Sequence, residues 1–309
     1  MKLSLIIPCY NEEGNVLPLY EKACSTFRDQ LNSYEFVFVN DGSFDGTRDV
    51  LKRLVKEAAV PVKVVGFSRN FGKESAIYAG LHEAEGEYIC IIDGDLQQSP
   101  ELVLEMVKYL DSTPDCDCVT AFQEDRNENS TVAFLKNGFY KVINSVSDTN
   151  FKSGASDFRT FRRNVAETIL SMSEYHRFSK GLFSWVGFNT HYIPYHADER
   201  LSGESKWNVI KLFKYAFDGI IAFSTAPLKV PTWIGLGTTV LGLSSGVVNS
   251  LRKSAGKDVE NVDRLSSLIM TMGGLQLTAI GVAGEYLART YVQVKKRPVY
   301  IVKDHWTNA

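Results

Sequence analysis

The sequence has little of several features that mark large classes of protein. Its 34 basic and 36 acidic residues nearly cancel to a net charge of −2, which argues against bulk electrostatic attraction to nucleic acid. Cysteine is scarce, because five residues in 309, all within the first 120, are too few for a secreted disulfide scaffold. No GxGxxG follows a predicted strand, and no Walker A or HExxH sequence is present. Dinucleotide redox chemistry and P-loop phosphate binding are therefore disfavoured.

Two further absences concern metal binding and export. Cys116-x-Cys118 has half the pattern of a zinc site, but no second CxC or CxxC supplies the remaining ligands. We therefore interpret the cysteines as reduced structural thiols. The first residues contain no apolar run long enough for a signal peptide, so we expect the N-terminal part to fold in the cytosol.

The first 120 residues alternate short apolar runs with longer amphipathic stretches. The runs are rich in Val, Ile and Phe, which is typical of strands buried on both faces. They cover Leu3–Pro8, Phe36–Asn40, Val62–Phe67, Tyr88–Ile92 and Cys118–Phe122. Helix-like stretches lie between them, such as Glu12–Leu31 and Thr47–Ala58, the second preceded by an N-cap signal at Asp45. This alternation predicts an α/β domain with a mostly parallel sheet and flanking helices.

Acidic, turn-rich segments follow three of the predicted strands, at residues 8–13, 40–47 and 93–98. One such segment alone would be an ordinary turn. Ligands of such sheets bind beyond the carboxyl ends of the strands, so three segments of this kind together predict a binding site there. Asp93 and Asp95 can place two carboxylates near one hard cation. Mg²⁺ or Mn²⁺ held there would stabilise a diphosphate leaving group.

Two long uncharged runs lie near the C-terminus, within a chain whose mean hydropathy is only −0.11. Val230–Leu251 has 22 residues without charge and Leu265–Gly284 has 20, while a bilayer core needs a helix of about 20 apolar residues. The polar loop Arg252–Arg264 separates them. We therefore predict a hairpin of two transmembrane helices, with two buried helices of a soluble core as the alternative.

Several motifs together resemble the family 2 glycosyltransferases of GT-A (Rossmann-like) fold. They are PCYNEE at 8–13, NDGSFDGT at 40–47, SRNFGKE at 68–74 and DGDLQ at 93–97. Later motifs resemble the branch that loads a sugar onto a polyprenyl phosphate, the bactoprenol glucosyltransferases and, more distantly, the dolichyl-phosphate mannose synthases. They are SDFR at 156–159, residues 178–187, RLSGESKW at 200–207, FSTAPL at 223–228, GEYL at 284–287 and RPVY at 297–300.

The resemblance implies roles for individual residues. The nucleotide-sugar site would comprise Pro8, Tyr10, Glu12, Asp41, Lys73 and Asp93. The divalent metal would be held by Asp95 with Asp93 and Gln97. Asp95 and Asp157 would be the catalytic residues, with Asp157 near the acceptor as a candidate base. Phosphates and the acceptor would be contacted by Arg126, Arg200, Ser205 and Lys206.

Phosphate chemistry leaves the role of Asp157 open at this point. A phosphate monoester has a second pKa near 6, so a polyprenyl phosphate is largely dianionic at neutral pH and needs little help from a base. Asp157 would then orient the acceptor or the sugar instead of abstracting a proton.

The resemblance implies inverting transfer of a sugar, glucose first, from a UDP-sugar to undecaprenyl phosphate. UDP-N-acetylglucosamine or GDP-mannose as donor is the alternative within the enzymes, and a non-catalytic membrane scaffold that retains the fold is the alternative from another class. A processive polysaccharide synthase is disfavoured, because Gln123-x-x-Arg126 is followed by Asn127 and the QxxRW motif is missing. The expected partners are the UDP-sugar, the polyprenyl phosphate and the membrane, without nucleic acid, and a homo-oligomer is compatible with the small anchor.

The predicted organisation places the catalytic part on the cytoplasmic side of the cell membrane, in a multi-pass protein. The predicted segments are a cytosolic catalytic domain (1–208), an amphipathic juxtamembrane helix (209–229), transmembrane helices at about 230–251 and 265–286 joined by a short polar loop, and a cytosolic tail (289–309).

Overall fold

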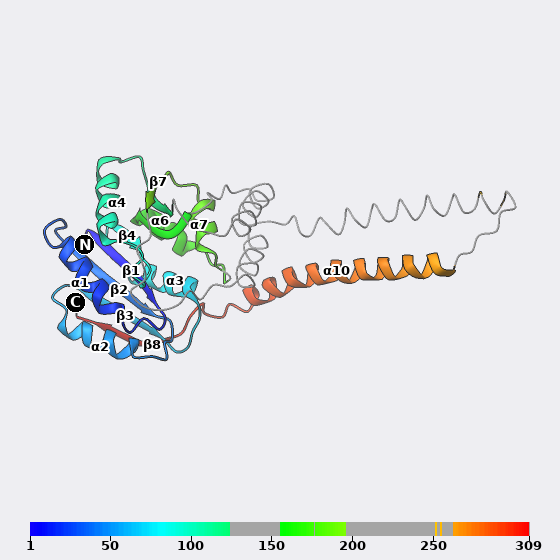
Figure 1. Cartoon of the computed structure of the whole chain (residues 1–309), viewed down its shortest axis with the longest axis horizontal. Helices are drawn as coiled ribbons and strands as arrows, with labels where there is room; N and C mark the ends of the chain where they lie inside the picture. Colours follow the sequence, from blue (N-terminus) through cyan, green and yellow to red (C-terminus); the bar gives the residue numbers. More distant parts are fainter. Residues whose placement is uncertain (124–154, 176, 196–250, 252–253, 255–261, 309) are drawn as a thin grey trace.

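An eight-stranded sheet with helices on both faces forms one end of the protein, as seen in a computed structural model (Figure 1). The structure describes residues 1–123, 155–175, 177–195, 251, 254 and 262–308. The strands are β1 (Leu3–Cys9), β2 (Tyr34–Asn40), β3 (Val62–Phe67), β4 (Tyr88–Ile91), β5 (Cys118–Gln123), β6 (Ala155–Arg162), β7 (Thr190–Tyr195) and β8 (Val302–Thr307). The described helices are α1 (Val16–Phe27), α2 (Thr47–Glu57), α3 (Lys73–Glu83), α4 (Pro100–Ser112), α6 (Arg163–Ser171), α7 (Ser179–Trp185) and α10 (Val262–Val294).

The order of the strands in the sheet is β7-β5-β6-β4-β1-β2-β3-β8. The central strands β4, β1, β2 and β3 run parallel, and β5 pairs parallel with β7. By contrast, β6 and β8 run antiparallel to their neighbours. The predicted α/β architecture with a mostly parallel sheet is confirmed, and the five apolar runs are β1 to β5. The prediction did not include β6, β7 or β8.

Helices cover the sheet in two layers, one on each face. Alternate residues of β1 point to opposite faces and therefore pack against different helix layers. Leu5 and Ile7 belong to the buried cluster that contains residues of α1, α2 and α4. Ile6 belongs to the opposite cluster, with residues of α3, α6 and α7. The packing of α3 on β1 is so close that a β-carbon at Gly80 would lie 2.3 Å from Ile6 Cγ2. This closeness fixes the position of α3, whose first residue enters the site described below.

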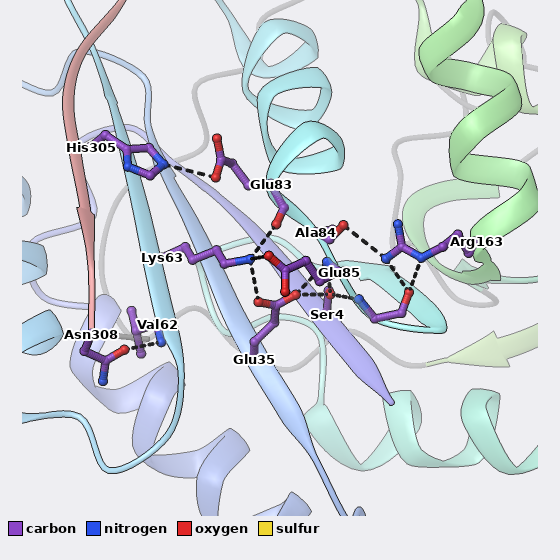
Figure 2. A network of polar contacts seen from close by, with 11 residues as sticks. Ser4, Glu35, Val62, Lys63, Glu83, Ala84, Glu85, Arg163, His305 and Asn308 are labelled. Carbon is purple, nitrogen blue, oxygen red and sulfur yellow. Dashed lines mark hydrogen bonds and ion pairs between the residues drawn. The ribbon is translucent and has the colours of Figure 1, made fainter. Parts of the chain in front are cut away.

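A buried ion pair ties β2 to β3 near the amino ends of the strands (Figure 2). Lys63 Nζ lies 3.1 Å from Glu35 Oε2, and the Glu35 side chain is 1% exposed. Lys63 also binds Glu85 Oε1 at 2.6 Å and donates to the Glu83 carbonyl at 2.9 Å. Ser4 Oγ donates to Glu35 and accepts from the Glu85 amide. Because buried charges are tolerated only when paired and hydrogen-bonded, this network holds the turn between α3 and β4 in one arrangement.

The end of the chain returns to the sheet as its edge strand β8 (Figure 1). Asp304 accepts two hydrogen bonds from Arg48 of α2, both 2.7 Å long. The Trp306 ring lies beneath the cations of Arg48 and Lys52, and Asn308 donates to the Ala58 and Val60 carbonyls. The sequence pattern predicts this segment only as part of a separate tail, because VKDHWT contains no apolar run that would mark it as a strand.

The long helix α10 contains the predicted second membrane span, about 265–286. Among the described residues, no helix combines the length and apolar character needed to cross a bilayer. The predicted first span, about 230–251, lies outside the described residues except for Leu251, and the predicted amphipathic helix at 209–229 lies wholly outside them.

The last turn of α10 is attached to the segment before α7. Gln293 Oε1 accepts from the Tyr175 amide at 2.7 Å, and Gln293 Nε2 donates to the Ser173 carbonyl at 2.7 Å. Together with β8, this contact fixes the C-terminal end of α10 on the sheet domain.

Replacing Asp304 by asparagine should loosen β8. The change removes a charge-assisted pair with Arg48, whose side chain is 43% exposed. We therefore expect the free energy of opening β8 to fall by about 1 kcal/mol. Hydrogen exchange of the β8 amides in the full chain measures it. In an Arg48→Met background the same change should accelerate exchange much less, and equal acceleration in both backgrounds would contradict the pairing.

Candidate active site

The loops after β1, β2 and β4 meet at the carboxyl edge of the sheet, as predicted from the three acidic segments. The Asn11 amide donates to Ser43 Oγ at 2.9 Å, and the Phe44 amide donates to Asn11 Oδ1 at 3.1 Å. A β-carbon at Gly94 would lie 3.6 Å from Glu12 Cγ, so the third loop contacts the first. That distance is an ordinary contact, and alanine or serine would also fit at position 94.

Asp41 holds the loop after β3, which leads into α3. Its Oδ1 accepts from the Phe71 amide at 2.6 Å, and its Oδ2 accepts from the Gly72 amide at 3.0 Å. The residue is 3% exposed, and burial raises its pKa to about 6 although the two amides act in the opposite direction. Beside it, Gly42 has a φ of +64°, and a β-carbon there would lie 2.3 Å from the Arg69 carbonyl carbon. Asp41 therefore fixes the loop that leads into α3. Its predicted contact with a nucleotide stays a prediction.

Lys73, the first residue of α3, brings two of the predicted acidic residues together. Its Nζ lies 2.5 Å from Asp93 Oδ1 and 3.0 Å from Asp157 Oδ2. Desolvation acts to lower the pKa of Lys73, but the two carboxylates outweigh it and the pKa rises. The Lys73 side chain keeps 41% of its surface exposed, so this cation can still meet a ligand.

Asp157, on β6, is surrounded by positive charge. Burial alone would raise its pKa, but Lys73, Lys180 and Arg159 lower it well below its usual range. Its Oδ1 is buried and has no hydrogen-bond partner among the described residues. A carboxylate this acidic stays ionised at neutral pH, which favours an orienting role over that of a base.

The turn after β4 carries both aspartates of the predicted metal site. Gln98 fixes it, because its Oε1 accepts from the Asp93 amide at 2.8 Å and its Nε2 donates to Asp93 Oδ2 at 3.2 Å. Asp95 Oδ1 accepts from the Gln97 amide at 3.2 Å. Leu96, between Asp95 and Gln97, has a φ of +62°, an uncommon and strained value for leucine of a kind that clusters at functional sites.

The donor set in this turn fits a metal that also binds substrate phosphates. No three His, Cys, Asp or Glu side chains within the described ranges lie close enough to hold a metal together. Mg²⁺ characteristically takes one or two carboxylates and completes its shell with phosphates and water, and Asp93 and Asp95 offer two carboxylates in one turn.

The remaining predicted nucleotide residues lie on β1 or in the loop after it. Pro8 is paired in register with Val39 of β2. The Tyr10 ring packs edge-on against Phe44 with centroids 6.0 Å apart, and Glu12 Oε2 accepts from Asn15 at 2.6 Å. Their contact with a base and ribose stays a prediction. The predicted phosphate and acceptor contacts lie outside the described residues; they are Arg126, Arg200, Ser205 and Lys206.

Three residues beside Lys73 and Asp157 are not predicted by the sequence patterns: Glu74, Ser179 and Lys180. Glu74 accepts hydrogen bonds from the amide and hydroxyl of Ser179, the first residue of α7. Burial, followed by the charge of Asp157, raises the pKa of Glu74 to about 7. Burial lowers the pKa of Lys180, which interacts electrostatically with Asp157. Glu74 and Lys180 lie within quoted motifs, but no spacing rule links them because the contact joins segments about 100 residues apart.

The match to a family model decides the class of protein. Residues 4–170 match the model of glycosyl transferase family 2. The chain belongs to glycosyl transferase family 2. A prophage bactoprenol glucosyl transferase homolog of Escherichia coli is 39% identical to this family 2 glycosyltransferase, over 98% of this chain and 99% of its own length. The bactoprenol glucosyl transferase of Shigella phage SfII is 38% identical over 98% of both chains.

A solved structure offers a more distant likeness. The glucosyl-3-phosphoglycerate synthase of Mycobacterium tuberculosis superposes on this glycosyltransferase with a TM-score of 0.49 at 15% identity, over 71% of this chain and 76% of its own. A likeness of that degree bears on neither the substrate nor the metal, so the family assignment rests on the sequence matches.

The raised pKa of Asp41 predicts a pH-dependent effect of Asp41→Asn on the stability of the glycosyltransferase. The folded state holds the Asp41 proton up to about pH 6, so the wild-type stability contributed by this group is present near pH 4 and is lost as the pH rises through 6. The variant lacks that loss. Relative to wild type, its free energy of unfolding should therefore rise between pH 4 and pH 7, by on the order of 2 kcal/mol.

Denaturant unfolding at several pH values checks this prediction. Asp29→Asn, at an exposed surface position, supplies the baseline. A stability difference between Asp41→Asn and wild type that stays constant from pH 4 to pH 7 would contradict the raised pKa.

Proposed function

We propose that this glycosyltransferase transfers glucose from UDP-glucose to undecaprenyl phosphate, or another polyprenyl phosphate, with inversion at the anomeric carbon. The observation that carries the proposal is the full-length similarity to relatives named bactoprenol glucosyl transferase. An α-linked nucleotide sugar would then give a β-linked lipid phosphosugar.

The charges of the site support direct displacement by the phosphate. The acceptor is largely dianionic at neutral pH and attacks without a general base. Asp157 is held ionised beside Lys73 and Lys180, which suits a group that orients cations and substrates and does not take up a proton. The main energetic cost of the reaction is the repulsion between the two anionic substrates. Fixed positive charges in the site reduce that repulsion.

Asp93 and Asp95, with Gln97 beside them, would hold the divalent metal, Mg²⁺ or Mn²⁺. A cation held there would screen the diphosphate and stabilise it as a leaving group. Lys73 adds a positive charge next to Asp93, in reach of the same phosphates. Arg126, Arg200, Ser205 and Lys206 remain our proposed contacts to phosphate and acceptor.

A lipid acceptor requires that the transfer take place at a membrane surface. We propose that the uncharged segments at about 230–251 and 265–286 anchor the catalytic domain at the cytoplasmic face, where the acceptor headgroup lies. Anchoring confines enzyme and acceptor to the same surface and so raises their effective concentration.

The donor sugar is tested with membranes containing the full chain, undecaprenyl phosphate and Mg²⁺ or Mn²⁺. We expect a lipid-linked sugar from UDP-glucose, and much less from UDP-N-acetylglucosamine or GDP-mannose. Product only from one of the other donors would overturn glucose. Absence of product from all three, together with no nucleotide binding by calorimetry, would favour the non-catalytic scaffold.

The metal assignment is tested with Asp95→Asn. The change keeps the size of the side chain but removes a charged ligand, so we expect activity to fall at least about 100-fold while the protein stays folded. Asp29→Asn makes the same chemical change at an exposed position and should keep full activity. Wild-type turnover by Asp95→Asn would remove this residue from the mechanism.

A further inference from the structure

The start of helix α7 is attached to the start of helix α3 by a carboxylate. Glu74, in the first turn of α3, accepts from the Ser179 amide at 2.8 Å and also from the Ser179 hydroxyl. Ser179 is buried, with 6% of its surface exposed. One side-chain oxygen of α3 therefore fixes both the backbone and the side chain of the residue at which α7 begins.

A second contact joins the same two segments one turn further along α3. Tyr78 lies four residues after Glu74, on the same face of the helix. The Arg177 guanidinium lies 4.1 Å from the centre of the Tyr78 ring. Arg177 also donates to the Met172 and Ile169 carbonyls at the end of α6. The approach to α7 is thus held against both α3 and α6, and Glu74 holds its first residue.

The next residue, Lys180, contributes its charge to the active site. It interacts electrostatically with Asp157, Lys73 and Asp93. Lys73 alone lies between two carboxylates, Asp93 and Asp157, which would leave this trio with a net negative charge. That charge would oppose the negative charge that builds up on the leaving diphosphate during transfer, which slows the chemical step. Arg159 and Lys180 both act on Asp157, and Lys180 is the cation that directly follows Ser179, so its charge offsets the trio only while the start of α7 is held in place.

We propose that Glu74 is a positioning residue that latches α7 onto α3 through Ser179 and thereby sets Lys180 against Asp157 and Lys73. This inference rests on the proposed function for its kinetic consequence, but the latch itself is a property of the fold. A carboxylate there can be replaced by an amide, because the glutamine oxygen can accept the same two hydrogen bonds.

The test compares Glu74→Ala, Glu74→Gln, Ser179→Ala and Lys180→Met in the full chain. With the donor that wild type uses, kcat should fall at least tenfold in Glu74→Ala and Lys180→Met, while KM for the nucleotide sugar changes less than threefold. Glu74→Gln should restore kcat to within threefold. Glu105→Gln, at an exposed position of α4, is the matched control and should match wild type.

Hydrogen exchange separates the latch from the chemistry. Peptides covering α7 should exchange at least tenfold faster in Glu74→Ala, at the wild-type rate in Glu74→Gln, and at the wild-type rate in Lys180→Met. Wild-type exchange and wild-type kcat in Glu74→Ala would overturn the proposal. If Glu74→Ala does not fold, Ser179→Ala takes its place, because this variant removes only the hydroxyl donor. Faster exchange of α7 together with a reduced kcat in Ser179→Ala would support the latch. Wild-type exchange and wild-type kcat in Ser179→Ala would overturn it.

Failure of the proposed function is recognised independently. If wild type transfers no sugar from any donor, the proposed function falls, while the exchange rates of α7 in Glu74→Ala and Glu74→Gln still decide the latch.

Discussion

The site depends on one lysine placed between two aspartates. Asp93 lies in the turn after β4 and Asp157 lies on β6, and their carboxylates converge on the same nitrogen, Lys73 Nζ. Two like charges converging in a partly buried place repel unless a cation lies between them. The Lys73 ammonium supplies that cation and keeps Asp157 ionised, and the Lys73 side chain remains partly exposed. The proposed displacement by the acceptor phosphate uses this arrangement of charge.

The rest of the fold holds α3, and with it Lys73, in position from several sides. Asp41 binds the amides of the loop that leads into α3, and Gly80 allows the helix to lie directly on β1. At the other end of α3, the network around Lys63 and Glu35 fixes the turn into β4. Because protein interiors are close-packed, these constraints are transmitted through α3 to the lysine without a flexible element between them.

Local sequence predicted the central strands well and the outer ones poorly, for a physical reason. Strands β1 to β4 are buried on both faces by two helix layers, and their sequences are therefore almost continuously apolar. The edge strand β8 is largely exposed, and its sequence is mixed in polarity. It is held by particular contacts, such as that between Asp304 and Arg48, which join residues 256 positions apart and leave no local periodicity.

The sequence alone determined the α/β class, the family, and the meeting of the loops after β1, β2 and β4 at one edge of the sheet, because short motifs and strand ends are local features. Only the tertiary structure decided which charges meet: that Lys73 bridges Asp93 and Asp157, that Asp41 holds a loop, and that Glu74 meets Ser179. Those pairings depend on the packing of α3 and α7 against the sheet. Electrostatic energy depends on distances in space, and a sequence does not specify those distances until the chain is folded.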